Sequence, residues 1–200
     1  MKLILLAENR TKQETIDHLV DGVQRVVPVH LDLSLISERY TLKSPIFTDL
    51  RSVAQRFLPN VLDEYLLILS HHPVRYVRND IYSTVVWTGR DSTGNFLYDG
   101  SFFDDDRVIL VGGDNFPSDN NVKLACHEVG HIFLNPIKGG WTEEGLQSAH
   151  CYNYVGDRRC IMNTNSESTK ITKEFLETLY LGYCQQCNNT MIENKKITIQ

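Results

Sequence analysis

Apolar residues follow two different spacings along the chain, and the spacing predicts which segments are strands and which are helices. Short apolar runs, or apolar residues at every second position, are typical of strands, whereas apolar residues three and four positions apart indicate a helix that packs by one face. The first pattern predicts strands over residues 2–8, 27–33, 65–70, 83–88, 95–98 and 107–111. The second pattern predicts helices over residues 11–26, 45–57, 122–133 and 171–181.

The order of these elements indicates how the chain is organised. Strands that alternate with helices predict an α/β (α+β) fold, with a mixed, mostly parallel twisted sheet and helices packed on it. After Pro136 the sequence changes to loops and cysteines, with one further helix. We therefore expect one domain with an N-terminal α/β lobe over residues 1–134, an irregular C-terminal lobe over residues 135–200, and a cleft between them.

Composition places the chain among ordinary globular proteins and excludes several kinds of partner. Its 200 residues are 42% hydrophobic and 22% charged, with a formal net charge of −5. This mild acidity, without a cluster of Lys and Arg, argues against a nucleic-acid surface. The apolar start, residues 3–7, is too short for a signal peptide or a membrane span. We therefore expect a cytoplasmic protein with no membrane partner.

The segment His-Glu-Val-Gly-His at residues 127–131 carries the clearest chemical signal. Residues four apart lie on the same face of a helix, so His127 and His131 can direct two imidazoles at one metal ion, most often a tetrahedral zinc. Glu128 lies one position further round the helix, near enough to take a proton from a water molecule there. Apolar residues at helical spacing lie on another face, so this helix is expected to pack on a core.

A catalytic zinc needs a third protein ligand, and two residues compete for that position. His150 lies 19 residues after His131 and would complete a site made of histidines. Glu144 lies 13 residues after His131, within a Trp-Thr-Glu-Glu-Gly-Leu string that is similar to the segment supplying the Glu ligand in gluzincin peptidases. The residue types alone leave both ligands open.

Four of the five cysteines fall in the last third of the chain, at Cys151, Cys160, Cys184 and Cys187. In a cytoplasmic protein, such a set with a Cys-x-x-Cys pair favours a structural zinc site over disulfides. The alternative is two unrelated thiols and a redox-active pair. Cys126 falls on the apolar stripe of the histidine-bearing helix and is expected in the core.

Taken together, these motifs resemble the archaemetzincin family of zinc metallopeptidases, which belongs to the metzincin clan. The resemblance covers residues 127–187. It implies three histidine ligands for a catalytic zinc, a glutamate as general base, a methionine in the turn beneath the metal, and four cysteines around a second, structural zinc. Carried over to this sequence, these roles fall on His127, His131 and His150; Glu128; Met162; and Cys151, Cys160, Cys184 and Cys187.

One departure from the family pattern lies between the second and third histidines. The family places them six residues apart, whereas here they are 19 apart, which is an insertion of 13. Longer loops cost little free energy, so the site can still close. We expect a zinc-dependent peptidase that hydrolyses peptide or protein substrates, with a gluzincin-type enzyme using Glu144 as the alternative. A further alternative is a latent, zinc-stabilised peptide-binding protein in which the segment 132–149 covers the cleft.

Overall fold

The structure is a computed structural model of the 200-residue chain. The residues that it describes are 1–35, 40, 48–49, 54, 56–57, 64–72, 74–77, 83–86, 89–90, 96–103, 107–134, 150–163 and 171–198. Among these residues, no helix has the length and apolar character needed to cross a lipid bilayer.

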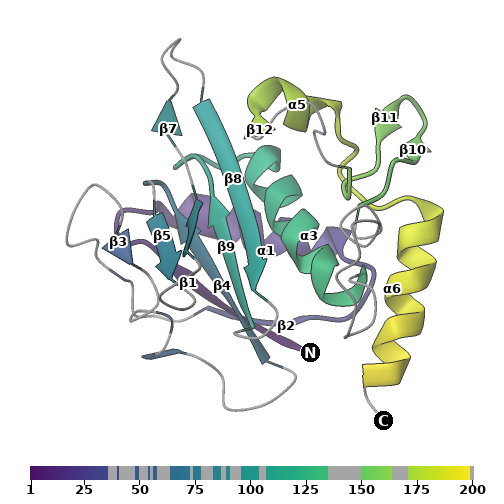
Figure 1. Ribbon diagram of the computed structural model, residues 1–200, viewed down its shortest axis with the longest axis horizontal. Helices are drawn as coiled ribbons and strands as arrows, with labels where there is room; N and C mark the ends of the chain where they lie inside the picture. Colours follow the sequence, from purple (N-terminus) through teal and green to yellow (C-terminus); the bar gives the residue numbers. More distant parts are fainter. Residues whose placement is uncertain are drawn as a thin grey trace.

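A mostly parallel sheet forms the N-terminal part of the molecule (Figure 1). Within it, β1 (Lys2–Ala7) is flanked by β2 (Asp32–Leu35) and β4 (Glu64–Ser70), both parallel to β1. Next to β4 lies the parallel strand β9 (Val108–Gly112), and β8 (Phe96–Phe103) then pairs with β9 in the antiparallel direction. The prediction of a mixed, mostly parallel sheet is confirmed.

Shorter strands join β8 or form small separate sheets. Both β7 (Gly89–Arg90) and β12 (Ile171–Thr172) pair antiparallel with the first residues of β8. Since β12 belongs to the C-terminal part of the chain, the main sheet contains residues from both parts. One separate sheet contains β3 (Thr48–Asp49), β5 (Val74–Val77) and β6 (Ser83–Val86). The other is the hairpin of β10 (Tyr154–Val155) and β11 (Arg158–Arg159).

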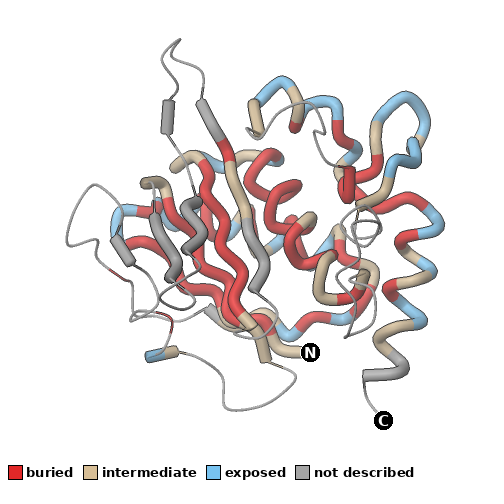
Figure 2. The backbone as a smooth tube through the Cα atoms, viewed as in Figure 1, coloured by how far each residue is buried: buried red, intermediate tan, exposed pale blue. Residues whose placement is uncertain are grey.

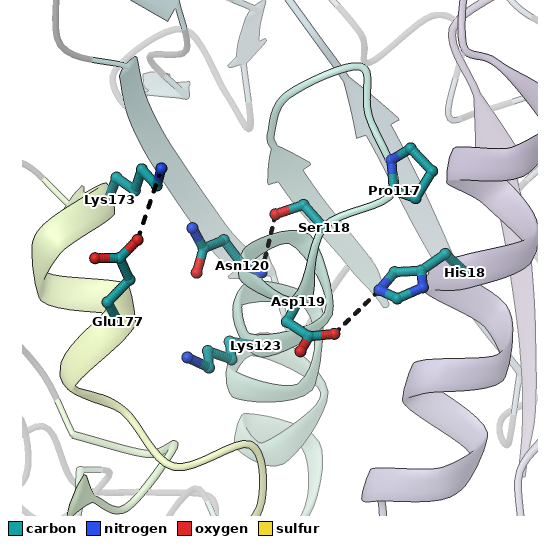
Figure 3. Close-up of a pocket in the computed structure, with 8 residues that line it drawn as sticks. All are labelled: His18, Pro117, Ser118, Asp119, Asn120, Lys123, Lys173 and Glu177. Atoms are coloured by element: carbon teal, nitrogen blue, oxygen red, sulfur yellow. Dashed lines mark hydrogen bonds and ion pairs between the residues drawn. The ribbon is translucent and has the colours of Figure 1, made fainter.

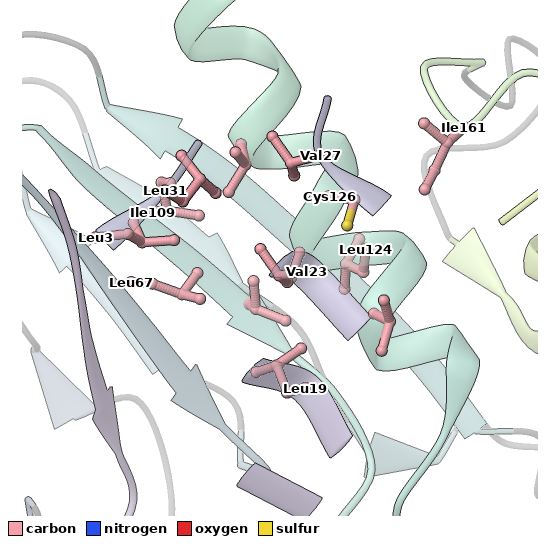
Figure 4. Packing of buried hydrophobic residues seen from close by; sticks show 14 of the residues in the cluster. Leu3, Leu19, Val23, Val27, Leu31, Leu67, Ile109, Leu124, Cys126 and Ile161 are labelled. Carbon is pink, nitrogen blue, oxygen red and sulfur yellow. The ribbon is translucent and has the colours of Figure 1, made fainter. Parts of the chain in front are cut away.

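Two helices cover one face of the sheet and pack against each other: α1 (Gln13–Val26) and α3 (Asp119–Leu134). Alternate strand residues point towards this face, so Leu67 and Ile109 join the same core cluster as Leu124 (Figure 4). Figure 2 shows mainly buried residues through β9, most of β4 and most of α3. The histidine-bearing helix therefore rests on a rigid, apolar support.

The opposite face of the sheet has a second, smaller core. It contains the intervening strand residues, among them Leu66, Ile68 and Leu110, together with Tyr40 and Ala54. Burial on both faces explains why residues 65–70 are a continuous apolar run instead of an alternating one.

Two of the predicted N-terminal elements are corrected by the structure. The strand expected over residues 27–33 is wrong for most of its length, because β2 begins only at Asp32. Alternate burial in the connection from α1, together with Pro28, which has no N–H to donate, produced a strand-like pattern without strand pairing. The strand expected over 95–98 is longer, since β8 runs to Phe103. The helix expected over 45–57 lies outside the described residues except at 54 and 56–57.

Among its described residues, the C-terminal part contains two helices, α5 (Lys173–Thr178) and α6 (Gln185–Thr198). The single helix predicted over 171–181 is therefore wrong: its first residues form β12, and the Thr172 side chain then caps α5 by accepting the N–H of Phe175. One core cluster includes residues of both parts, from β1 to α6. The division into lobes at residues 134 and 135 stays a proposal.

Candidate metal centres

The helix α3 begins at a local cap and is held at its start by polar contacts. Ser118 Oγ accepts the N–H of Asn120 at 3.2 Å, which is the usual N-cap arrangement. The amide of Asn121 donates to the carbonyl of Asp114 at 2.9 Å. These contacts fix the start of α3 relative to the end of β9, about two turns before the first histidine.

Three imidazoles converge beside the middle of α3. His127 and His131 project from consecutive turns of α3, and His150 approaches from the C-terminal part of the chain. The ring centroids are 4.9, 5.0 and 5.3 Å apart. Three imidazoles bound to one tetrahedral zinc at a Zn–N distance of about 2.1 Å would have centroids about 5.2 Å apart. The arrangement therefore fits a single zinc ion with one open position.

A backbone carbonyl fixes the orientation of the first imidazole. Nδ1 of His127 donates to the carbonyl oxygen of Ile161 at 2.8 Å, because a carbonyl can only accept. This leaves Nε2 with its lone pair, which is the form that binds a metal. Burial, followed by the nearby ring of His150, lowers the pKa of His127 to about 4, so the ring is neutral at physiological pH.

The carboxyl group of Glu128 is buried between α3 and β8. Its exposed fraction is 6%. A Cβ atom at Gly100 of β8 would lie 2.5 Å from Glu128 Oε1, so only glycine leaves room for this carboxyl group. Burial, followed by the charge of Asp99, raises the pKa of Glu128 to about 8. A cation at the imidazoles would favour the ionised form again, so the group can both accept and release a proton near neutral pH.

Met162 lies beneath the histidine-bearing helix. A Cβ atom at Gly130 would collide with the sulfur of Met162, so the glycine in the middle of the motif permits this close approach. Met162 itself is fully buried. The position agrees with the predicted methionine beneath the metal, although the role remains a proposal.

Four thiols form a second cluster, about which the C-terminal part is arranged. Cys151 and Cys184 have sulfurs 3.5 Å apart, and those of Cys160 and Cys187 are 3.9 Å apart. A tetrahedral zinc with Zn–S distances of about 2.3 Å requires sulfurs about 3.8 Å apart, whereas a disulfide requires about 2 Å. None of the five cysteines forms a disulfide. The spacing fits a zinc ion.

The thiol cluster favours one thiolate, at Cys160, whereas burial raises the pKa of Cys151 and the hydrogen bond with Cys160 raises that of Cys187. The hydrogen bond with Cys187, and after it the N–H of Cys184, lower the pKa of Cys160 to about 5. A thiolate is the form of cysteine that binds a metal. The fifth cysteine, Cys126, is buried in the core as expected, and burial raises the pKa of its thiol.

Short contacts join the thiol cluster to the histidine-bearing helix. Tyr183, the neighbour of Cys184, donates its hydroxyl to the carbonyl oxygen of Cys126 at 2.5 Å. The Ile161 carbonyl that orients His127 follows directly after Cys160. The thiol cluster therefore holds the groups that position the first imidazole.

Two cavities adjoin the N-terminal half of α3. The larger, of about 470 Å³, is an open hollow at the start of the helix, bordered by α1 and α5 (Figure 3). The smaller, of about 30 Å³, lies next to His127 between α3 and α5. Lys123, one turn before His127, lines both cavities.

Sequence patterns did not find every residue that shapes this site. The competing ligand Glu144 lies outside the described residues. Gly100 and Lys123 were missed, because a glycine in a strand and a lysine in a helix carry no chemical signal until their neighbours are known. Tyr183 was missed as well, although its place beside Cys184 offered a weak indication.

The fold thus combines a mostly parallel sheet that has an antiparallel strand, a helix that carries paired histidines, and a methionine packed against that helix. Two solved structures have the same fold. One is a zinc-dependent peptidase from Methanocorpusculum labreanum, 16% identical with a TM-score of 0.59, matched over 94% of this chain and 99% of that chain. The other is the archaemetzincin from Archaeoglobus fulgidus in complex with malonate, 13% identical with a TM-score of 0.51, matched over 95% and 99%.

These likenesses confirm the archaemetzincin resemblance at the level of the fold. No family model matches the chain, and no curated protein sequence matches it. The fold, and not the amino-acid identity, therefore links this chain to the two solved structures.

Proposed function

We propose that this protein is a zinc-dependent peptidase. The observation that carries the proposal is the convergence of three imidazoles on one point, next in sequence to the buried carboxyl group of Glu128. The fold likeness to a structure described as a zinc-dependent peptidase supports the same conclusion.

The ligands of the catalytic zinc would be His127, His131 and His150. Zinc bound there polarises a substrate carbonyl and makes a neighbouring water molecule more acidic. The chain supplies what surrounds that chemistry. The Ile161 carbonyl holds the first imidazole in its ligating form, and Met162 supports the helix from below.

Glu128 would move the proton. As carboxylate it accepts a proton from the attacking water, and as carboxylic acid it passes that proton to the departing amine. Its carboxyl group packs against β8 at Gly100, and this contact holds it in place between the two steps. The raised pKa of about 8 supports a group that exchanges protons near neutral pH.

A second zinc bound by Cys151, Cys160, Cys184 and Cys187 would have a structural role. All four positions are occupied by protein sulfur, which leaves no place for substrate. We propose two zinc ions per chain, one catalytic and one structural. Free thiols throughout also suit the cytoplasmic location expected from the sequence.

The proposal is tested by substituting Glu128→Gln and measuring metal content and peptide cleavage together. We expect both zinc ions to remain, because the carboxyl group is not a ligand, and cleavage to fall by at least about a hundredfold. A Glu128→Gln protein with two zinc ions and undiminished cleavage would refute the assignment. A wild-type protein that binds both zinc ions but cleaves no peptide of a diverse library would favour the latent binding protein.

The third ligand is tested by two single substitutions. The position of His150, with its ring about 5 Å from both other rings, supports histidine. His150→Ala should therefore lower the affinity for the catalytic zinc, whereas Glu144→Ala should leave it unchanged. The reverse result would identify the gluzincin-type alternative.

A further inference from the structure

Lys123 is a buried cation in a position where the fold does not require one. Its exposed fraction is 5%, although lysine is rarely buried without a partner. It lies on α3 one turn before His127, so both side chains project from the same face of the helix. Figure 3 shows its side chain extending from α3 towards α5.

The ammonium group has more donors than partners. It donates one hydrogen bond, to the backbone carbonyl of Leu176 at 2.7 Å. An ammonium has three N–H donors, and within the described part of the chain the other two have no acceptor. Burial is also the main reason why the pKa of Lys123 is lowered. A buried polar group that lacks partners is costly, so this one calls for an explanation.

The neighbouring carboxylates do not neutralise it. Asp119 pairs with His18 at 3.1 Å, and Glu177 pairs with Lys173 at 3.7 Å. No ion pair joins either of them to Lys123 in the described residues. Burial, and after it the positive charge of Arg158, lower the pKa of Lys123, and the more weakly acting charges of Asp119 and Glu177 oppose this shift without reversing it. The ammonium group therefore has no directly paired carboxylate among the described residues, and its charged form remains disfavoured until an anion binds.

The small cavity provides a place for that anion next to the candidate catalytic metal. Its walls are His127, Lys123 and apolar side chains of β12 and α5, including Ile171 and Phe175. The amide of Asn163, the other polar side chain of the lining, is already engaged with Cys151 and Arg159. Lys123 is thus the cationic donor of this cavity, with two further N–H groups available for an anion. A volume of about 30 Å³ accommodates a group the size of a carboxylate and excludes an aromatic ring.

We propose that Lys123 is a specificity-determining residue that binds a carboxylate of the substrate on the leaving-group side of the bond to be cleaved. This inference rests on the proposed peptidase function and adds the substrate class to it. The carboxylate can come from an Asp or Glu side chain just after the cleaved bond, or from the C-terminus of the peptide. Charge-assisted hydrogen bonds from a desolvated ammonium would distinguish it from a neutral amide or an apolar group.

The test uses the zinc-loaded protein and peptides that differ at one position. Peptides with Glu, Gln, Asp, Asn or Leu after the cleaved bond are prepared with free and with amidated C-termini, and kcat/KM is measured for each. We expect the acidic residue to be preferred over its amide by about tenfold to a hundredfold. A preference that follows the free C-terminus instead, whatever the residue, would identify the terminal carboxylate as the ligand and exopeptidase action.

Substitutions locate the preference. Lys123→Met should abolish the preference and Lys123→Arg should retain it. Lys2→Met, at a partly exposed lysine of β1 that lines neither cavity, is a control that should leave the preference intact. Zinc content and circular dichroism report whether each variant folds, and the wild-type peptide series does not depend on any variant. Cleavage without an acidic or terminal-carboxylate preference would overturn the inference but leave the peptidase function standing.

A binding measurement separates this inference from the peptidase function. In the Glu128→Gln background, calorimetry with the Glu and Gln peptides should show at least about tenfold tighter binding of the acidic one, lost on Lys123→Met. This result would hold even if no peptide were cleaved. Equal affinities for both peptides would overturn the inference.

Discussion

The two ends of the molecule reach a stable structure by different means. The N-terminal sheet buries apolar side chains on both faces, with Leu66 and Leu67 of one strand in separate cores. The C-terminal part has, among its described residues, three short strands, two helices and four clustered thiols, and it exposes aromatic residues such as Tyr152 and Tyr154. The stability of the N-terminal sheet depends on hydrophobic burial. The stability of the C-terminal part is expected to depend on a bound metal, as is usual for small, loop-rich units.

This difference explains why the candidate active site lies where it does. The helix α3 gives two imidazoles a rigid support on the apolar core, whereas the third imidazole and the Ile161 carbonyl come from the thiol-bearing part. A site assembled from both parts exists only while both are folded. Its metal affinity therefore reports on the stability of each.

The largest effect is expected from breaking the thiol cluster. Cys160→Ser should remove the structural zinc and destabilise the C-terminal part by more than about 3 kcal/mol, because structural zinc contributes on the order of 10 kcal/mol to folding. Cys126→Ala is the matched control: it removes a buried thiol from the apolar core but should leave both zinc ions in place. Metal analysis and thermal unfolding check both variants, and equal zinc loss in the two would contradict the distinction.

A smaller effect is expected from a cavity in the sheet. Leu67→Ala should lower the free energy of unfolding by about 2–5 kcal/mol, since the side chain is buried between strand and helix. Both zinc ions should remain. Ile192→Ala, at an exposed position of α6, should change the free energy of unfolding by less than about 0.5 kcal/mol. Denaturant unfolding with metal analysis measures both, and loss of the thiol-bound zinc in Leu67→Ala would show that the two parts are not separable.

The smallest effect is expected at the contact between the parts. Tyr183→Phe removes the hydrogen bond to the Cys126 carbonyl and should cost about 1 kcal/mol. Because that carbonyl directly precedes His127, zinc affinity of the histidine site should fall slightly while the thiol site keeps its metal. Competition with a chromogenic chelator measures the two affinities. An equal loss at both sites would argue against a contact that acts on the histidines.

The sequence was most informative where chemistry depends on local spacing. His127 and His131 are four residues apart on a helix, so their convergence followed from helical geometry alone. Apolar length likewise predicted β4. Contacts between residues distant in sequence could not be predicted from such patterns. The packing of the Glu128 carboxyl group against Gly100, and the burial of Lys123 beneath α5, depend on tertiary structure.

The errors also have physical causes. Residues 27–31 alternate in burial because one side of an extended connection faces the core, not because they pair in a sheet. Helix α6 escaped prediction because its polar sequence has only a weak apolar stripe, and its position is fixed by contacts such as that of Asn194 with the Phe133 carbonyl. Tertiary context overrode the local pattern in both cases.

His150 and Cys151 are consecutive residues, yet they belong to different metal clusters. When Cys151 is fixed by a metal, His150 next to it loses most of its conformational freedom. The entropy cost of ordering the third imidazole is then part of metal binding at the thiols, and metal binding at the histidines no longer includes it. Occupancy of one site should then raise affinity at the other, and by reciprocity the effect must run equally in both directions. A single peptide bond would thereby make binding at the two proposed zinc sites cooperative.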